Sequence, residues 1–353
     1  MRYNSTSLFA AALLIIYPLF AQAMTNTEAK ALAISAVKGD ASNVKELEQA
    51  AVKGDATAQS WLGVYYVAQK NYVTANVWFL KAAEQGDAPA EYNLGVSYYH
   101  GQGVPQNYVT ANAWYRKAAE QGDAPAEYNL GVAYYHGHGV PQNYVIADAW
   151  FLKAAKQGDA GAEYNLGVSY YHGHGVPQNY VIADAWFLKA AKQGNAGAEY
   201  NLGVAYYHGH GVPQNYVIAD AWFLKAAEQR DAGAEYNLGV AYYHGHGMPQ
   251  NYVTANAWLL KAAEQGNAGA ENNLGFAYYY GQGVPQNYVT ANAWYRKAAE
   301  QGYAMAEYNL GVAYYHGHGV PQNSTLAIYW VKKAADQGYA PAERGLRIIE
   351  TGN

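Results

Sequence analysis

The sequence predicts an all-α fold, an α-solenoid built from about eight helix-turn-helix hairpins. One stretch, AEYNLGVAYYHGHGVPQNYVIADAWFLKAAKQG (residues 126–158), recurs with small changes along almost the whole chain of 353 residues. A repeat of 20–50 residues is typical of a stacked array, in which each unit contacts only its neighbours. In every copy the apolar residues follow helical spacing, and a loop rich in Gly and Pro divides the copy in two. The period is 36 residues, as shown by Leu94, Leu130, Leu166, Leu202, Leu238, Leu274, Leu310 and Leu346, and by Trp78, Trp114, Trp150, Trp186, Trp222, Trp258, Trp294 and Trp330.

The first half of each copy predicts a helix, called helix A here. In the Leu130 copy it begins after Asp123, a favourable N-cap residue, and ends near His136, before Gly137. Pro141 prevents the helix from continuing through the loop. Gly131 leaves room for the close approach of another helix, which offsets its low helix propensity.

The second half predicts helix B, from the N-cap Asn143 to Gln157, just before Gly158. We expect the Trp and Phe rings to fill the space left by small residues of neighbouring helices, so that the tryptophan layers carry much of the stability. One copy has Arg230 where the others have the terminal Gly, and a left-handed turn there would cost Arg about 1 kcal/mol. The expected buried stripe is Ala147, Trp150, Phe151, Ala154 and Ala155.

The ends of the chain differ from the regular copies. Residues 24–55 predict a more polar pair of helices that covers the open end of the stack, and 56–350 is the predicted solenoid. Its first repeat, 56–86, is shortened because the HGxGVPQ loop is reduced to AQK. Residues 340–350 are expected to form a closing half repeat.

The first 23 residues predict a secretory signal peptide. Arg2 gives the positive start, the apolar centre runs from Leu8 to Phe20, and Ala21-Gln22-Ala23 is a cleavage triplet. The apolar run of 13 residues is shorter than the roughly 20 that a membrane span needs. We therefore expect cleavage after Ala23, no stable membrane span, and a periplasmic or secreted protein; the alternative is a retained N-terminal anchor.

Composition excludes several classes of function. Charged residues make up 14% of the chain and the formal net charge is -5, which argues against nucleic acid as a partner. There is no cysteine, so disulfides and thiolate metal sites are excluded. The GxG loop follows a helix instead of a strand, and neither G-x-S-x-G nor H-E-x-x-H occurs. We expect no catalytic residue, no metal and no cofactor; Glu127 and its equivalents are interpreted as solvated residues of the first helical turn.

All eleven histidines occur at one place in the repeat. A ladder of metal-binding or pH-sensing groups is one hypothesis, because His-Gly-His offers two imidazoles. The alternative, which we favour, is that these side chains cap the carbonyl end of helix A. They are His100, His136, His138, His172, His174, His208, His210, His244, His246, His316 and His318.

A row of tyrosines on helix A is the preferred candidate for a binding surface. Tyr128 and Tyr135 lie on a face rotated away from the Leu130 stripe, with Asn129 beside them. Such rings and amides suit a peptide, a partner helix or a glycan. The alternative is that one Tyr of each pair packs between successive A helices, an alternative that applies more to the second Tyr. The candidate residues are Tyr92, Tyr99, Tyr128, Asn129, Tyr135, Tyr164, Asn165, Tyr171, Tyr200, Asn201, Tyr207, Tyr236, Asn237, Tyr243, Tyr308 and Tyr315.

The paired motifs A-x-A-E-x-N-L-G-x-x-Y-x-x-G-x-G-V and A-x-x-W-x-x-K-A-A-x-Q-G resemble the Sel-1-like repeat (SLR) family, a branch of the tetratricopeptide-type repeats. The resemblance covers residues 56 to 350 and implies a right-handed α-solenoid whose inner surface is formed by helix A. It also implies a scaffold for protein–protein interaction, which in exported bacterial members serves envelope maintenance or host-cell contact. Its residues here are Ala124, Ala126, Leu130, Gly131, Tyr134, Gly137, Gly139, Val140, Pro141, Trp150, Lys153, Ala154, Ala155 and Gly158.

Two other functions stay open at this point. One is binding of cell-wall peptidoglycan or another glycan through the aromatic rows. The other is a penicillin-acting hydrolase, as linked to the Helicobacter cysteine-rich proteins, an exported branch of the family. Those proteins join each helix pair by a disulfide, and this chain has no cysteine to do so. Protein binding without enzymatic activity is therefore the preferred prediction, with a protein or peptide partner.

Overall fold

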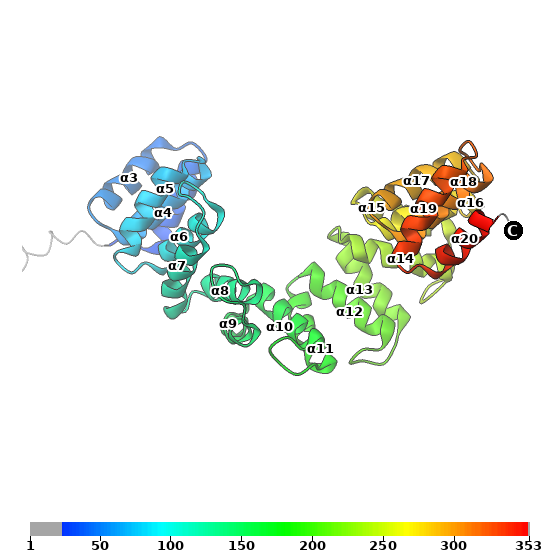
Figure 1. Ribbon diagram of the computed structural model, residues 1–353. Helices are drawn as coiled ribbons and strands as arrows, with labels where there is room; N and C mark the ends of the chain where they lie inside the picture. Colours follow the sequence, from blue (N-terminus) through cyan, green and yellow to red (C-terminus); the bar gives the residue numbers. More distant parts are fainter. Residues whose placement is uncertain (1–22, 352–353) are drawn as a thin grey trace, which may run out of the picture. The chain divides into compact units, whose positions relative to one another are not determined.

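The computed structural model describes residues 23–351, which contain nineteen helices and no strand (Figure 1). The predicted signal peptide lies outside the described residues except for Ala23, so its cleavage stays a prediction. The chain divides into two compact units, Met1–Ala162 and Glu163–Asn353. Within each unit, helices that follow one another in the chain pack together, from α2 to α9 in the first unit and from α11 to α20 in the second, as expected for a solenoid-like repeat fold.

Two helices precede the repeats, as the sequence of residues 24–55 predicts. Helix α2 (Asn26–Val37) starts with a capping box, in which the Thr25 hydroxyl accepts from the Glu28 N–H and the Glu28 carboxylate accepts from the Thr25 N–H. Helix α3 (Ala41–Val52) is capped by Asp40. Gly39 and Gly54 follow the two helices in the left-handed conformation.

The repeats alternate A and B helices. The A helices are α4 (Ala56–Ala68), α6 (Ala88–His100), α8 (Ala124–His136), α10 (Ala160–His172), α12 (Ala196–His208), α14 (Ala232–His244), α16 (Ala268–Tyr280), α18 (Ala304–His316) and the last helix, α20 (Ala340–Thr351). The B helices are α5 (Tyr72–Ala83), α7 (Tyr108–Glu120), α9 (Tyr144–Lys156), α11 (Tyr180–Lys192), α13 (Tyr216–Glu228), α15 (Tyr252–Glu264), α17 (Tyr288–Glu300) and α19 (Ser324–Asp336).

The predicted starts and stops of the helices are confirmed. Asp123 caps α8 by accepting the Ala126 N–H, and Asn143 caps α9 by accepting the Ile146 N–H. Gly137 ends α8 with a φ of 76°, a left-handed conformation that an L side chain adopts only with strain.

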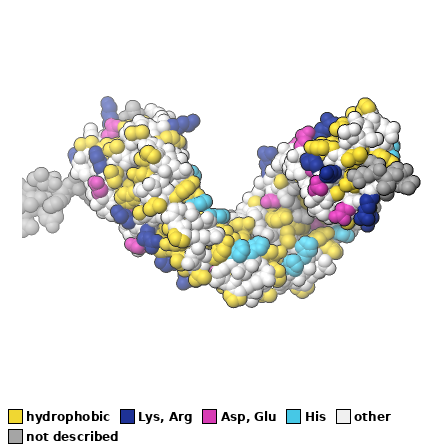
Figure 2. Space-filling model, viewed as in Figure 1, with side chains coloured by type: hydrophobic (Ala, Val, Ile, Leu, Met, Phe, Trp, Pro, Cys, Tyr) yellow, Lys and Arg dark blue, Asp and Glu magenta, His cyan; other side chains and the backbone are white. Residues whose placement is uncertain are grey.

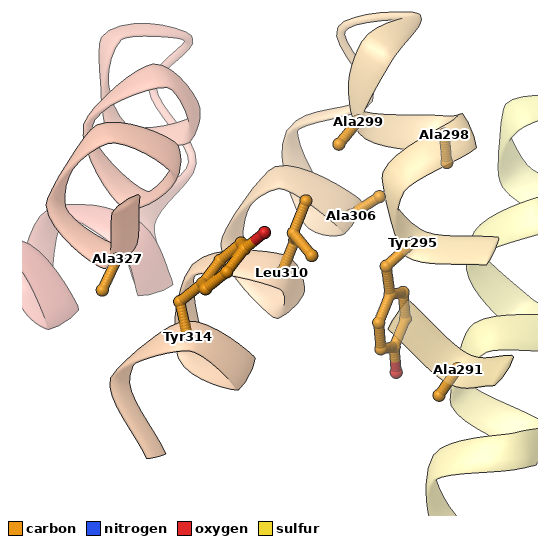
Figure 3. Close-up of a cluster of buried hydrophobic side chains, with 8 residues drawn as sticks. All are labelled: Ala291, Tyr295, Ala298, Ala299, Ala306, Leu310, Tyr314 and Ala327. Atoms are coloured by element: carbon orange, nitrogen blue, oxygen red, sulfur yellow. The ribbon is translucent and has the colours of Figure 1, made fainter. Parts of the chain in front are cut away.

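The core of each repeat is a large side chain of helix B inserted against a glycine of helix A. A Cβ added to Gly131 would lie 2.5 Å from two carbons of the Phe151 ring, which is fully buried. Alanines of both helices surround this contact. Figure 3 shows one such layer, in which Tyr295, Leu310 and Tyr314 lie among alanines of α17, α18 and α19. The residues at the Phe151 position are Phe79, Tyr115, Phe151, Phe187, Phe223, Leu259, Tyr295 and Val331.

The expectation that the tryptophans fill the core is wrong. Trp150 is only partly buried and packs on the edge of the cluster formed by α7 and α8. The Lys153 Nζ atom lies 3.8 Å from the centroid of its ring. Side chains of adjacent helix residues point about 100° apart, so Trp150 and Phe151 cannot both face Gly131, and the one that does is Phe151. The tryptophans therefore lie at the edge of the core and cover it, while Phe, Tyr, Leu or Val fills its centre.

Arg230 has the strained conformation that its position predicts. Its φ is 66°, close to the 79–86° of the glycines at the same place in other copies, such as Gly158 and Gly338. We expect Arg230→Gly to raise the free energy of unfolding by about 1 kcal/mol, because glycine adopts this conformation without a Cβ penalty. Thermal unfolding of the purified variant measures the gain. The control is Gln229→Gly, one residue earlier at a φ of -92°, where glycine should destabilise; a gain in both variants would contradict the explanation.

Candidate interaction surface

The predicted tyrosines and asparagines all lie on A helices of the described chain, and all are partly buried. They form two rows that differ in what they contact. The first row contains Tyr128 and its equivalents, together with the adjacent asparagines. The second row contains Tyr135 and its equivalents, one residue before the end of the helix.

The first row packs between successive A helices and is linked across repeats by hydrogen bonds. The Tyr128 ring lies 5.9 Å from the Phe151 ring, centroid to centroid, and a Cβ on Gly161 of the next helix would be 3.0 Å from it. The hydroxyl of Tyr200 is hydrogen-bonded to the Asn237 side chain of the following repeat, and burial raises the pKa of Tyr200 above its ordinary value. The first tyrosine, not the second, thus fills the space between A helices.

The same link occurs elsewhere in the row. Tyr92 is hydrogen-bonded to Asn129, and Tyr236 to Asn273. The asparagine amide also turns back onto its own helix; the Asn237 Nδ2 atom donates to the Gly233 carbonyl at 3.0 Å. Residues that the sequence places 37 positions apart therefore meet, and within each unit they form a fixed row of phenol rings and amides.

The second row belongs to a junction between repeats that sequence reasoning missed. The Tyr99 hydroxyl lies 3.1 Å from Nδ1 of His138, in the loop of the next repeat. The His138 ring stacks on Tyr108 with centroids 5.2 Å apart. The Asn112 Nδ2 atom donates to the His138 carbonyl at 2.7 Å. We call this set of contacts, Tyr99, Tyr108 and Asn112 with the loop residues His138 and Gly139, the loop clasp.

The clasp recurs in other copies, and in two of them Gln102 or Gln282 takes the place of the histidine. Asn76, Asn256 and Asn292 donate to the loop carbonyl in the same way as Asn112, at 2.6–2.8 Å. Three copies have aspartate at this position instead: Asp148, Asp184 and Asp220.

An ionised aspartate cannot donate to the loop carbonyl. Asp184 is 8% exposed, and its Oδ2 atom lies directly against Gly211, where a Cβ would collide with it. Neither carboxylate oxygen of Asp184 or Asp220 has a hydrogen-bond partner in the described part of the chain. Burial raises the pKa of each carboxyl to about 7. These two clasps are therefore sensitive to pH in the neutral range.

The histidines fall into two groups. His138, His210, His246 and His318 belong to the clasps, where their Nδ1 atoms face a tyrosine hydroxyl. His136 and its equivalents end the A helices at the surface, and the His136 ring stacks on His138 with centroids 5.4 Å apart. Figure 2 shows histidines exposed on the surface of the molecule. Between residues 23 and 351 no three His, Cys, Asp or Glu side chains come close enough to hold one metal ion.

The interpretation of Glu127 as a solvated residue is wrong. Glu127 is 4% exposed, and its Oε2 atom accepts from Nε2 of Gln157 at 2.8 Å. Burial raises the pKa of Glu127, while the Gln157 hydrogen bond and the Lys153 charge lower it. The same bond joins Glu91 to Gln121 and Glu235 to Gln265. It ties the start of helix A to the end of helix B in the same repeat, which is a structural role.

A second surface runs along the B helices. The second residue of helix B is an exposed valine in every copy from Val73 to Val289. Val181, for example, is 63% exposed and Val217 is 64% exposed. Ile146 and Leu152, at positions where the copies differ, are 38% and 39% exposed. Sequence reasoning did not identify the valines as exposed, because valine next to a helix start is equally compatible with burial.

The comparisons with known proteins identify the repeat. The Sel1 repeat family matches the chain in eight consecutive stretches, 56–87, 88–123, 124–159, 160–195, 196–231, 232–267, 268–303 and 304–339. No curated protein matches the chain. None of the described helices has both the length and the apolar character needed to cross a bilayer.

Two solved structures are similar over most of the chain. One is a protective antigen of uropathogenic Escherichia coli strains that displays an SLR fold, at 40% identity and a TM-score of 0.78; the match covers 86% of this chain and 66% of that one. The other is a Sel1 repeat protein from Oxalobacter formigenes, at 33% identity and a TM-score of 0.67, covering 89% of this chain and 93% of that one. The chain therefore belongs to the Sel1 repeat family, whose members are generally non-enzymatic scaffolds and whose repeats typically mediate protein interactions.

Proposed function

We propose that this protein is an exported scaffold that binds a protein or peptide partner, in the cell envelope or in contact with a host cell. The observation that supports this function is the row of hydrogen-bonded tyrosines and asparagines along the A helices, such as Tyr200 with Asn237. The same ring and amide recur at fixed positions in successive repeats. An extended partner would meet the same chemistry once per repeat.

The fixed arrangement of this row favours binding. Tyrosine supplies a large contact area with few rotatable bonds, and interface hot spots are rich in this residue. The Tyr200 ring is already held by Phe223 and Gly233, and its hydroxyl by Asn237. Little side-chain entropy remains to be lost on binding. The asparagine amides offer hydrogen bonds to a peptide backbone.

Export rests on the sequence of the first 23 residues, with cleavage after Ala23 and a periplasmic or secreted mature chain. The relative with 40% identity is a protective antigen of uropathogenic strains. A role of the present chain outside the cytoplasm agrees with that description.

The A-helix row is tested by placing charges on it. We expect Asn201→Arg combined with Asn237→Arg to weaken partner binding at least tenfold, because two long cationic side chains then obstruct the row. The partner is isolated by crosslinking and capture from the cells that make the protein, identified by mass spectrometry, purified and titrated against each variant.

The matched control uses the exposed B-helix surface of the same repeats. Val217→Arg combined with Val253→Arg adds the same charge at positions that are about two-thirds exposed, and should leave both folding and binding unchanged. Loss of binding in the control alone would place the interface on the B helices. Co-sedimentation of the protein with purified peptidoglycan would instead support wall binding, and turnover of a chromogenic β-lactam would support a hydrolase.

A further inference from the structure

The described chain begins with a contact between its first residues and the first repeat. Met24 is partly buried and packs against the cluster that contains Ala29, Leu47 and Leu62. Its main-chain N–H donates to the Oδ2 atom of Asp55 at 2.7 Å. Ala23, one residue earlier, is exposed. The start of the cap is thus joined to a carboxylate 31 residues away.

Asp55 already has a role at this place. It is the N-cap of α4, and its Oδ1 atom accepts the Ala58 N–H at 2.8 Å. One carboxylate oxygen therefore caps the first repeat, and the other receives Met24. Met24 and Asp55 both line a cleft of about 930 Å³ formed by α2, α3 and the residues just before α4. Partial enclosure of this kind strengthens an interaction between charges.

We infer that cleavage between Ala23 and Met24 creates an α-ammonium group that forms an ion pair with Asp55 and thereby locks the N-terminal cap onto the first repeat. In this hydrolysis one water is consumed, the C–N bond breaks, Ala23 keeps the new carboxylate and Met24 keeps the new amine. The nitrogen that now donates as a neutral amide then donates as a cation, which adds the attraction between two full charges to the hydrogen bond. The inference rests on the proposed export, because removal of the signal peptide supplies the amine.

The consequence is local, because an end of a solenoid opens more readily than its middle. Helix α2 follows Met24 directly, and its amides report the opening of the cap. We expect hydrogen exchange of the α2 amides to be about fivefold to tenfold slower in a chain that starts at Met24 than in one that starts at Ala21. The difference should fade above about pH 8, where a free amine loses its proton.

The experiment compares four purified proteins that all end at Asn353. Two start at Met24 and two start at Ala21, each produced from a fusion cleaved directly before the first residue, and each start is combined with Asp55 or with Asp55→Asn. Asparagine is a suitable replacement because Asn195 caps α12 in the same way, accepting the Ala198 N–H at 2.9 Å. The variant therefore keeps the helix cap, while the oxygen that receives Met24 is replaced by an amide nitrogen, which carries no charge and cannot accept.

The inference is supported if the Met24 start slows exchange in α2 with Asp55 and has no effect with Asp55→Asn. Equal exchange for both starts, or a difference that persists with Asp55→Asn, would overturn it and leave the proposed export untouched. N-terminal sequencing of the protein from its own cells is the second measurement. A first residue other than Met24 there would overturn both the inference and the proposed cleavage site.

Discussion

The double variant Asp184→Asn, Asp220→Asn is expected to be more stable than the natural chain at pH 8 and equally stable at pH 4. In the natural chain both carboxyls are buried without a hydrogen-bond partner, next to a loop that the equivalent Asn112 holds by donating to the His138 carbonyl. Asparagine at these positions donates at every pH, whereas aspartate donates only when it is protonated.

The direction of the pH dependence follows from the pKa of each carboxyl, which burial raises to about 7 in the folded chain. The folded state then binds more protons than the unfolded state between about pH 4 and pH 7, so stability of the natural chain falls as the pH rises through this window. A shift from about 3.9 sets an upper bound of about 4 kcal/mol for each site. Because the loop can open and admit water to the carboxylate, we expect a gain of about 1–3 kcal/mol per site above pH 7.

A charged group close to either carboxyl would be a second cause of its pKa shift, in competition with burial. Tyr171, Tyr180 and His210 are the titratable side chains at the Asp184 clasp, and within residues 23–351 no Lys, Arg or His nitrogen lies within 4.0 Å of either carboxylate.

Thermal and denaturant unfolding at pH 4, 6 and 8 measure the effect. The reverse substitution, Asn256→Asp, is the matched control, because the Asn256 amide donates to the Gln282 carbonyl at 2.7 Å in the same unit of the chain. It should destabilise the protein at pH 8 and leave it unchanged at pH 4. A gain from Asp184→Asn and Asp220→Asn that is the same at all three pH values would show that the buried charge is not its cause.

Much of the fold could be predicted from the sequence because its signals are local. Asp123, Gly137 and Asn143 each bond within a few residues of themselves, and the helices start and end where these residues predict. Gly131 predicts a point of close approach between helices, because glycine is otherwise unfavourable inside a helix. The family resemblance, confirmed by eight Sel1 repeat matches, depended on the same local motifs.

The parts that could not be predicted depend on contacts 20–39 residues apart. Trp150 and Phe151 are adjacent aromatic residues, and the sequence alone does not show which of them is buried in the core. The position of Gly131 shows that it is Phe151. Glu127 looks like a surface residue until Gln157 is placed next to it, 30 positions later. In the loop clasp Asn112 donates to a backbone carbonyl. Every residue type has such a carbonyl, so the sequence of the loop does not reveal this hydrogen bond. The replacement of this asparagine by Asp148, Asp184 and Asp220 was the one visible signal of an unusual site.

The tyrosine rows could be predicted in part: the sequence shows where the rings lie on helix A, but not which residues they contact. Helical spacing placed Tyr128 and Tyr135 on one helix and away from Leu130, and both are partly exposed, as a surface role requires. Spacing within one helix could not show that Tyr200 bonds Asn237, or that Tyr99 bonds His138, because these partners belong to the next repeat. Whether the rows bind a partner stays a prediction, to be decided by the charged variants described above.

Phe223→Ala is expected to lower the free energy of unfolding by about 3–5 kcal/mol, the cost of removing a buried aromatic ring without refilling its space. Phe223 is 1% exposed and packs with Leu238 and the alanines of α13 and α14. Its ring also faces Gly203 of α12, where an added Cβ would lie 2.5 Å from two ring carbons. Because of this contact, Gly203→Ala compares two opposing effects on stability: the higher helix propensity of alanine and the collision of its Cβ with the Phe223 ring. Helix propensity favours alanine by about 1 kcal/mol, whereas the collision should destabilise by about 1–3 kcal/mol.

The two effects are separated by combining the substitutions. In Gly203→Ala, Phe223→Ala the added methyl group enters space that the ring has left, so the double variant should lose less stability than the sum of the two single variants. Gly197→Ala is the control in the same helix, because an added Cβ would lie 3.1 Å from the Tyr164 ring and other copies have Pro89, Pro125 or Met305 at that position; it should cost less stability than Gly203→Ala. Denaturant unfolding gives all four values. If the single losses simply added, Gly203 and Phe223 would not form the close contact on which the core of each repeat depends, and the large-against-small packing inferred for the other repeats would lose its support.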